Sequence, residues 1–305
     1  PQGSVLGPLL FLIFINDLPK CLRHTVSNIY ADDTEIHCGG DSVSEVCSLL
    51  QLDIDNIVQW FLANKLTLNL TKTYCMLASS NRNVLNEVLN LSVNGLLIEQ
   101  VNSTRYLGLV PDSMLSWTEH VTMLCNKIAP KVGILRRLKH VVPSESLKLV
   151  YQSIIQPHID YCITTWGFTT NINLDKVQRL QNRAARIITG NYDRNVRGID
   201  LVKDLGWFTI RQRRDYFTAI TTFKALHGTS PDYMCDMFTF SRDLATYNTR
   251  TVSDNTLCVP RVNKSIYAQS LQVNGPKIWN SLPSKIRKTN SLSSFKRYLR
   301  KFLLG

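Results

Sequence analysis

The spacing of apolar residues predicts a mixed first third of the chain and a helical remainder. Two β-prone runs, 27–30 and 34–38, flank a tight turn and predict an antiparallel hairpin, because strands joined so closely cannot run parallel. A Ser42-x-x-Glu45 capping pattern and apolar residues at helical spacing up to Phe61 predict one long amphipathic helix. Residues 5–15 predict a loop that feeds a short buried helix.

Further strands are predicted at 66–68, 74–77 and 104–109. Asn94-Gly95 between two apolar runs predicts a second hairpin, since this turn needs positive φ at both central residues. From about Trp117 the pattern predicts helices, at about 117–138, 147–159, 174–189, 208–227 and 291–304. The predicted fold class is therefore α+β.

Composition supports a folded chain. It has 305 residues, of which 44% are hydrophobic and 19% charged, and this length predicts about two domains. The longest apolar run, residues 9–15, is far short of the roughly 20 residues that span a bilayer. The eight cysteines form no CxxC pair, and the irregular spacing of Cys21, His24, His37 and Cys38 favours unpaired thiols over a metal site.

Charge is unevenly distributed along the chain. Residues 1–110 hold 6 Lys/Arg and 10 Asp/Glu, whereas residues 111–305 hold 29 and 13. A basic remainder of this kind suits a polyanionic partner, but it also suits a soluble protein of high pI, so charge alone does not decide the function.

The strongest candidate for chemistry is Tyr30-Ala31-Asp32-Asp33. Two adjacent carboxylates in a tight turn repel each other, and a bound cation would relieve that repulsion. Phosphoryl transfer uses such carboxylates to hold two divalent ions. An ordinary exposed turn, in which Asp is favoured, is the alternative.

Neighbouring motifs extend this pattern. Pro1-Gln2-Gly3-Ser4, continuing to Phe11, lies about twenty residues earlier, and Asn69-x-x-Lys72-Thr73 and Tyr106-Leu107-Gly108 follow. The set resembles the PQGS, YxDD, N-x-x-KT and YLG motifs of reverse transcriptases of LINE-type (non-LTR) retrotransposons. Residues 116–120, 134–138, 157–162, 166–167, 180–188 and 279–283 resemble the downstream region of the jockey-like elements.

The resemblance implies a role for each matching residue. It makes Asp32 a ligand of catalytic Mg²⁺, with Asp33 supporting or sharing that role, and it places Tyr30 near the primer end. It implies that Gln2 and Gly3 face template and incoming nucleotide. Lys72 would lie near the departing pyrophosphate, although a solvated lysine in a turn is the alternative. Tyr106 and Gly108 would belong to a primer-grip hairpin.

The resemblance also implies missing parts. Reverse transcriptases use a third carboxylate from a strand upstream of the PQGS segment, and the sequence starts in mid-motif at Pro1. Asp17 does not match that position. We therefore expect an N-terminally truncated fragment, without the fingers, that is inactive alone.

A second candidate site is independent of any family. Cations spaced three, four and three apart would share one face of the 174–189 helix: Lys176, Arg179, Arg183 and Arg186. Such a face suits a phosphate backbone or is simply solvated. Arg211, Arg213 and Arg214, and Lys296, Arg297, Arg300 and Lys301, repeat the signal more weakly, whereas Trp60-Phe61 and Phe295/Tyr298/Phe302 are interpreted as core.

The sequence thus predicts the rear half of a right-hand polymerase palm (1–110), a helical thumb (111–190) and a helical C-terminal region of unknown role (191–305). The implied function is RNA-directed DNA polymerase (reverse transcriptase), with RNA template, DNA primer, deoxynucleoside triphosphates and Mg²⁺ as partners. A nucleic-acid-binding remnant without catalysis and a non-functional relic are the alternatives. The resemblance implies an intracellular ribonucleoprotein of nucleus and cytoplasm.

Overall fold

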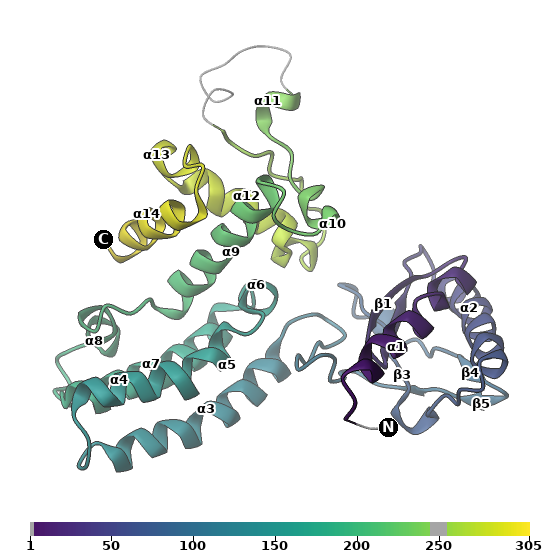
Figure 1. Ribbon diagram of the computed structural model, residues 1–305, viewed down its shortest axis with the longest axis horizontal. Helices are drawn as coiled ribbons and strands as arrows, with labels where there is room; N and C mark the ends of the chain where they lie inside the picture. The colour runs from purple at the N-terminus through teal and green to yellow at the C-terminus, as the bar shows by residue number, and fades with distance from the viewer. Residues whose placement is uncertain (1–2, 245–254) are drawn as a thin grey trace. The chain divides into compact units, whose positions relative to one another are not determined.

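The computed structural model describes residues 3–244 and 255–305, which form two compact units, Pro1–Thr104 and Arg105–Gly305 (Figure 1). The first unit is mixed α and β, and the second is helical apart from two isolated β-bridges. This arrangement confirms the α+β class. Within the described residues, no helix is both long and apolar enough to cross a membrane.

The first unit places its longest helix, α2, among short strands and turns. Its elements are α1 (Leu6–Ile15), η1 (Leu18–Cys21), β1 (Val26–Tyr30), β2 (Asp33–His37), α2 (Val43–Ala63), η2 (Leu70–Lys72), β3 (Tyr74–Cys75), η3 (Val84–Asn86), β4 (Ser92–Val93), β5 (Leu96–Leu97) and β6 (Glu99–Gln100). β1–β2 and β4–β5 are antiparallel pairs, and β3–β6 is parallel. Ser42 caps α2 by accepting from the Glu45 amide, as the capping pattern predicts. Asn94 and Gly95, both at positive φ, form the predicted turn of the β4–β5 hairpin.

Two of the strand predictions are wrong. Residues 66–68 are not a strand, because Lys65 at φ 58° turns the chain and the Leu66 amide bonds back to the Phe61 carbonyl to close α2. Residues 104–109 form only a β-bridge between Tyr106 and Leu109, since the segment reverses direction between them.

The burial predicted for the 5–15 helix is also wrong. Helix α1 forms, but only Ile15 is buried. A helix that is apolar on every side is buried only where other elements surround it. In this unit only the end of α1 at Ile15 is buried, where it packs with Leu18 and Ile57. The exposed apolar side chains are Val5, Leu6, Leu9, Leu10, Leu12, Ile13 and Phe14.

The second unit contains long helices around two cores. Its helices are α3 (Thr118–Leu138), α4 (Ser144–Ile154), α5 (Gln156–Asp160), α6 (Ile163–Trp166), α7 (Asn171–Thr189), α8 (Gly198–Asp204), α9 (Ile210–Leu226), α10 (Asp232–Cys235), α11 (Ser241–Leu244), η5 (Tyr267–Gln269), α12 (Leu271–Ser281), α13 (Ser284–Arg287) and α14 (Leu292–Leu304). The first core lies among α3, α4 and α7, and Trp166 is fully buried in it. The second lies where α9 meets α12 and α14, and it contains Phe223, Trp279 and Phe295.

Two buried glutamines connect α7 to the start of α9. Gln178 accepts from the Ile210 amide at 2.9 Å, and Gln181 donates to the Phe208 carbonyl at 2.9 Å and to the Tyr151 hydroxyl at 3.2 Å. Because buried amides left without partners cost free energy, these bonds fix the position of α9 on α7. The Leu180–Ile188 motif is therefore partly a packing motif.

The aromatic stripe of the last helix was predicted to be core, and the prediction is wrong for two of its three residues. Phe295 is buried, whereas Tyr298 and Phe302 are 36% and 44% exposed. α14 buries the side that carries Phe295 and Leu299, and the other two rings lie beyond the edge of that side.

Candidate active site and nucleic-acid face

The Tyr30-Ala31-Asp32-Asp33 segment forms the tip of the β1–β2 hairpin, as predicted. Tyr30 pairs with Asp33 across the strands, so Ala31 and Asp32 are the two turn residues. Ala31 has φ 53°, a backbone region that residues other than glycine rarely adopt. Tyr30 is 67% exposed, and both carboxylates are exposed. The hairpin thus presents two adjacent carboxylates and a phenol to solvent.

The hairpin's inner side rests on the unit's core. Ile29 of β1 and Ile36 of β2 pack against buried side chains of the unit. On the outer side, Asn28 donates to Glu35 at 2.6 Å, and His37 contacts the other oxygen of Glu35 at 3.1 Å. Apolar packing on one side and polar pairing on the other fix the register that places Asp32 in the turn.

Asp53 of α2 holds the chain just before β1. Its carboxylate is fully buried and accepts the amides of Arg23, His24 and Thr25 at 2.8–3.1 Å, and the Thr25 hydroxyl at 2.9 Å. Burial alone would raise the pKa of Asp53, but these hydrogen bonds to the charged form outweigh it and lower the pKa.

Sequence reasoning missed Asp53. The signal was an acidic residue three positions after Leu50 and four before Ile57, within the apolar stripe of the predicted helix. A carboxylate in such a stripe must find hydrogen-bond donors when it is buried.

The structure before α1 gives a reason for the glycine and the serine of the Pro1-Gln2-Gly3-Ser4 motif. Gly3 has φ 88°, which favours glycine, and the Ser4 hydroxyl accepts the Gly7 amide at 3.0 Å at the start of α1. Gly3 is exposed, and no atom lies within 4 Å of where a Cβ would stand. Gln2 lies outside the described residues.

Lys72 lies in a self-contained turn. Asn69 accepts the Thr71 amide at 3.1 Å and the Thr71 hydroxyl at 2.7 Å, and its carbonyl accepts the Lys72 amide at 3.0 Å. The Asn69-x-x-Lys72-Thr73 pattern thus has a structural basis in η2. The Lys72 ammonium is exposed, on a different turn from the two carboxylates.

Tyr106-Leu107-Gly108 forms a tight turn that belongs to the second unit. Leu107 and Gly108 both have positive φ, and the turn is closed by two hydrogen bonds between Tyr106 and Leu109. The Tyr161 hydroxyl donates to the Leu107 carbonyl at 2.6 Å, and a Cβ on Gly108 would meet the Tyr161 ring at 3.4 Å. Tyr161, which follows α5, therefore fixes this turn, a role that the sequence did not reveal.

The four cations of α7 differ in their surroundings. Arg179 and Arg183 are exposed, and Lys176 is half-buried and donates to Asn173 at 3.2 Å. Arg186 donates to the carbonyls of Asp193 at 3.0 Å and Val196 at 2.5 Å, so its guanidinium secures the loop after α7. Arg179 and Arg183 remain as a pair of solvent-facing cations one helical turn apart.

The carboxylates at the hairpin tip fit only part of a divalent-cation site. Magnesium takes oxygen ligands in octahedral geometry, and Asp32 and Asp33 can supply such oxygens. Within the described ranges, no group of three or more His, Cys, Asp or Glu is placed to hold a metal ion.

The eight cysteines are free thiols, and burial raises the pKa of Cys21 and Cys38, which keeps these thiols protonated.

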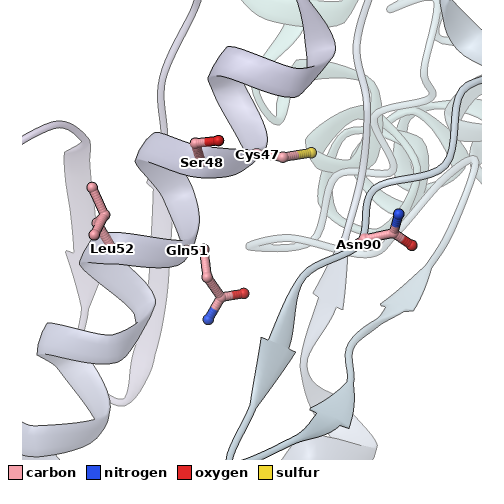
Figure 2. A pocket seen from close by; sticks show the side chains of 5 residues that line it. All are labelled: Cys47, Ser48, Gln51, Leu52 and Asn90. Atoms are coloured by element: carbon pink, nitrogen blue, oxygen red, sulfur yellow. The ribbon is translucent and has the colours of Figure 1, made fainter.

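A hollow elsewhere in the first unit is lined by Cys47, Ser48, Gln51, Leu52 and Asn90 (Figure 2). None of these residues is charged. Gln51 is committed to structure, since it donates to the Ser92 carbonyl and accepts the Ser92 amide, both at 2.9 Å. The hollow thus offers no charged side chain to bind an ion.

Comparison with known proteins agrees with the motifs. Residues 1–110 match the family described as reverse transcriptase (RNA-dependent DNA polymerase). The chain is 29% identical over 225 residues to the probable RNA-directed DNA polymerase from transposon BS of Drosophila melanogaster, which covers 70% of this chain and 24% of that protein. It is 30% identical over 206 residues to the RNA-directed DNA polymerase from mobile element jockey of the same species, with 62% and 22% covered.

The motifs and this match agree that residues 1–110 are similar to the reverse transcriptase domain. Over most of its length the chain is similar to RNA-directed DNA polymerases of mobile elements, among them those from transposon BS and jockey. It spans about a quarter of the length of these relatives. No solved structure matches it significantly.

Proposed function

We propose that this chain is the rear part of an RNA-directed DNA polymerase whose active site is built on the β1–β2 hairpin. The observation that carries the proposal is the exposure of Asp32 and Asp33 at the tip of a hairpin fixed from within, in a segment that matches the reverse transcriptase family. In this proposal residues 1–110 are the rear of the palm, residues 111–190 the thumb and residues 191–305 a C-terminal region.

Asp32 and Asp33 are the proposed metal-holding residues. Bound Mg²⁺ would offset the charge that develops on the attacking and leaving oxygens. Asp32 and Asp33 would contribute anionic oxygens, and the fixed hairpin would hold those oxygens without reorganisation. The Asp53 hydrogen bonds would act through the backbone before β1 to keep the hairpin in place.

The other residues would position substrates. Tyr30 shares the hairpin tip with the carboxylates and would contact the primer end. Gln2 and Gly3 would face template and incoming nucleotide, and the lack of a side chain at Gly3 permits close approach. Lys72 would meet the pyrophosphate, and the turn of Tyr106 and Gly108 would hold the primer.

The α7 face would contact the phosphate backbone. Arg179 and Arg183 supply solvent-facing cations, with Lys176 beside them. Arg186 would act indirectly, by fixing the following loop. Changing Arg179 and Arg183 to Gln should weaken binding to any RNA or DNA and flatten its salt dependence.

A nucleic-acid-binding remnant without catalysis is the second candidate. It is favoured by the small number of metal-ligating groups, since the hairpin supplies only two adjacent carboxylates. The two candidates differ in what Asp32→Ala does. A polymerase loses activity, whereas a binding remnant loses nothing.

The test is primer extension on an RNA template with magnesium. The protein would be this chain fused behind the preceding segment of the Drosophila melanogaster jockey relative, compared with the same fusion carrying Asp32→Ala. Asp41→Ala, which removes an exposed carboxylate before α2, is the matched control. We expect Asp32→Ala to abolish extension and Asp41→Ala to preserve it. Extension that survives Asp32→Ala would rule out the hairpin as the site.

A further inference from the structure

The end of the chain carries an unusual charge pattern. Residues 255–305 contain ten Lys or Arg and no Asp or Glu. Cations there cannot be neutralised by carboxylates of the same segment. Any neutralisation must come from elsewhere in the protein or from a ligand.

The basic run of α9 shows what internal neutralisation looks like. Arg211 pairs with Asp175 at 2.9 Å, Arg213 forms a double hydrogen bond with Asp160, and Arg214 pairs with Asp215 at 2.7 Å. This run was a weak nucleic-acid candidate in the sequence. Its charges are used within the protein.

Helix α14 differs. Lys296, Arg297 and Lys301 are exposed, and no ion pair within 4 Å joins any of the three to a carboxylate in the part of the chain that the structure describes. Arg300 is partly engaged, since it donates to the Gly206 carbonyl at 3.3 Å and lies over the Phe208 ring. Three cations on one helix therefore face solvent without a carboxylate partner.

Two exposed rings accompany these cations. Tyr298 and Phe302 are one helical turn apart, as are Arg297 and Lys301, so the two pairs run side by side along α14. The Arg297 guanidinium lies over the Tyr298 ring, 5.2 Å from its centre. Exposed aromatic rings beside cations are the features on which unpaired bases stack.

We propose that α14 is a binding surface for single-stranded nucleic acid, with Arg297 and Lys301 on the phosphates and Tyr298 and Phe302 against the bases. Lys296 on α14 and Lys285 on the neighbouring α13 are also exposed and add positive charge. The site lies apart from the β1–β2 hairpin in sequence, and it requires no polymerase activity.

The same helix is less suited to a lipid surface. A membrane-bound amphipathic helix inserts its apolar side, but α14 has already buried Phe295 and Leu299 in the second core. What remains exposed is mainly cationic, with two rings and Leu304 at the end of the helix. Single-stranded nucleic acid uses both kinds of group, so we take it as the ligand class.

The test is fluorescence anisotropy with the 305-residue chain and three probes: a single-stranded RNA, a single-stranded DNA of the same sequence and the DNA duplex. Tyr298→Leu with Phe302→Leu removes the rings but keeps apolar bulk, and we expect about tenfold weaker binding of both single strands. Binding of the duplex should change less than about twofold, because its bases are already stacked. A difference between RNA and DNA would identify which strand the surface prefers.

Arg297→Gln with Lys301→Gln tests the phosphate contacts. For single strands, losing two such contacts should reduce the slope of log affinity against log salt by about 1.4. Lys20→Gln with Arg82→Gln, two exposed cations of the first unit, removes the same charge and should leave the slope within about 0.3 of the unmodified chain.

Several results would overturn the proposal. They are equal weakening of single strands and duplex by the ring variants, equal slopes for both charge variants, or no binding of any single strand at low salt. Binding of α14 to phosphatidylserine vesicles that the ring variants abolish, without an effect on RNA, would assign the surface to lipid instead. Thermal melts of each variant would confirm that these solvent-facing changes leave the fold intact.

Discussion

The two units differ in how completely they bury their apolar side chains. The second unit encloses two cores in which Trp166, Trp279 and Phe295 are almost inaccessible, and it exposes surplus cations. The first unit divides its buried residues between two small clusters and leaves most of α1 exposed. Exposed apolar area of this extent is typical of an interaction surface. The unit with the candidate chemistry is thus the one whose long apolar helix is mostly uncovered.

The largest expected effect separates the units. Residues 105–305 expressed alone should unfold in one cooperative thermal transition, because both cores lie within that range. Residues 1–104 alone should lack such a transition and should bind a dye such as ANS, since Leu6, Leu10 and Ile13 remain uncovered. Circular dichroism melts with dye fluorescence make the comparison. A sharp, dye-silent melt of 1–104 would refute the contrast.

The stability of the second unit should decrease in acid. His120 is buried between Trp117 and Trp166, and burial, helped by Lys127, lowers its pKa from 6.5 to about 4. The unfolded chain then binds more protons than the folded one between these values. Stability is full above pH 6.5 and falls by roughly 3 kcal/mol as the pH drops to 4.

His120→Phe should remove this dependence, as measured by urea unfolding at pH 7 and pH 4.5. The lowered pKa of His158 acts in the same direction, and the raised pKa of the half-buried Asp215 acts in the opposite one. His158 and Asp215 are present in both the unmodified protein and His120→Phe. The difference in pH dependence between these two proteins therefore reports His120 alone. Equal pH dependence in the two proteins would mean that His120 does not titrate as proposed.

A smaller effect is expected in the first unit. Asp53→Asn would set an amide NH₂ against the backbone donors before β1 and should destabilise the unit by about 2 kcal/mol. Hydrogen exchange of the Arg23, His24 and Thr25 amides should accelerate. Asp55→Asn, an exposed neighbour on the same helix, is the control and should change stability by less than about 0.5 kcal/mol. If the three amides exchange as slowly in Asp53→Asn as in the unmodified protein, the Asp53 hydrogen bonds do not hold the chain before β1.

Local signals predicted much of this fold. The Asp32 turn, the Asn94-Gly95 hairpin and the amphipathic helices follow from spacing and turn chemistry, which act over a few residues. The exposure of α1 did not follow, because burial depends on which other elements surround a helix. Nor could spacing separate the arginines of α9 from the cations of α14, since only the fold brings Asp160 and Asp175 to the former. Asp53 and Tyr161 act on segments 28 and 54 residues away, beyond any local pattern.

We propose that the β1–β2 hairpin supplies part of a polymerase site and that its two carboxylates do not suffice alone. Two divalent ions about 3.5–4 Å apart need several anionic ligands to offset their mutual repulsion. Asp32 lies in the turn and Asp33 begins β2, and two adjacent carboxylates supply too few anionic oxygens to enclose both ions. We therefore propose that further anionic ligands complete the site.

The most direct measurement is magnesium-dependent primer extension on an RNA template by the 305-residue chain alone, beside its fusion to the preceding jockey segment. We predict template-dependent extension by the fusion and none by the chain alone. Extension by the chain alone would contradict the account, because it would show that two adjacent carboxylates suffice.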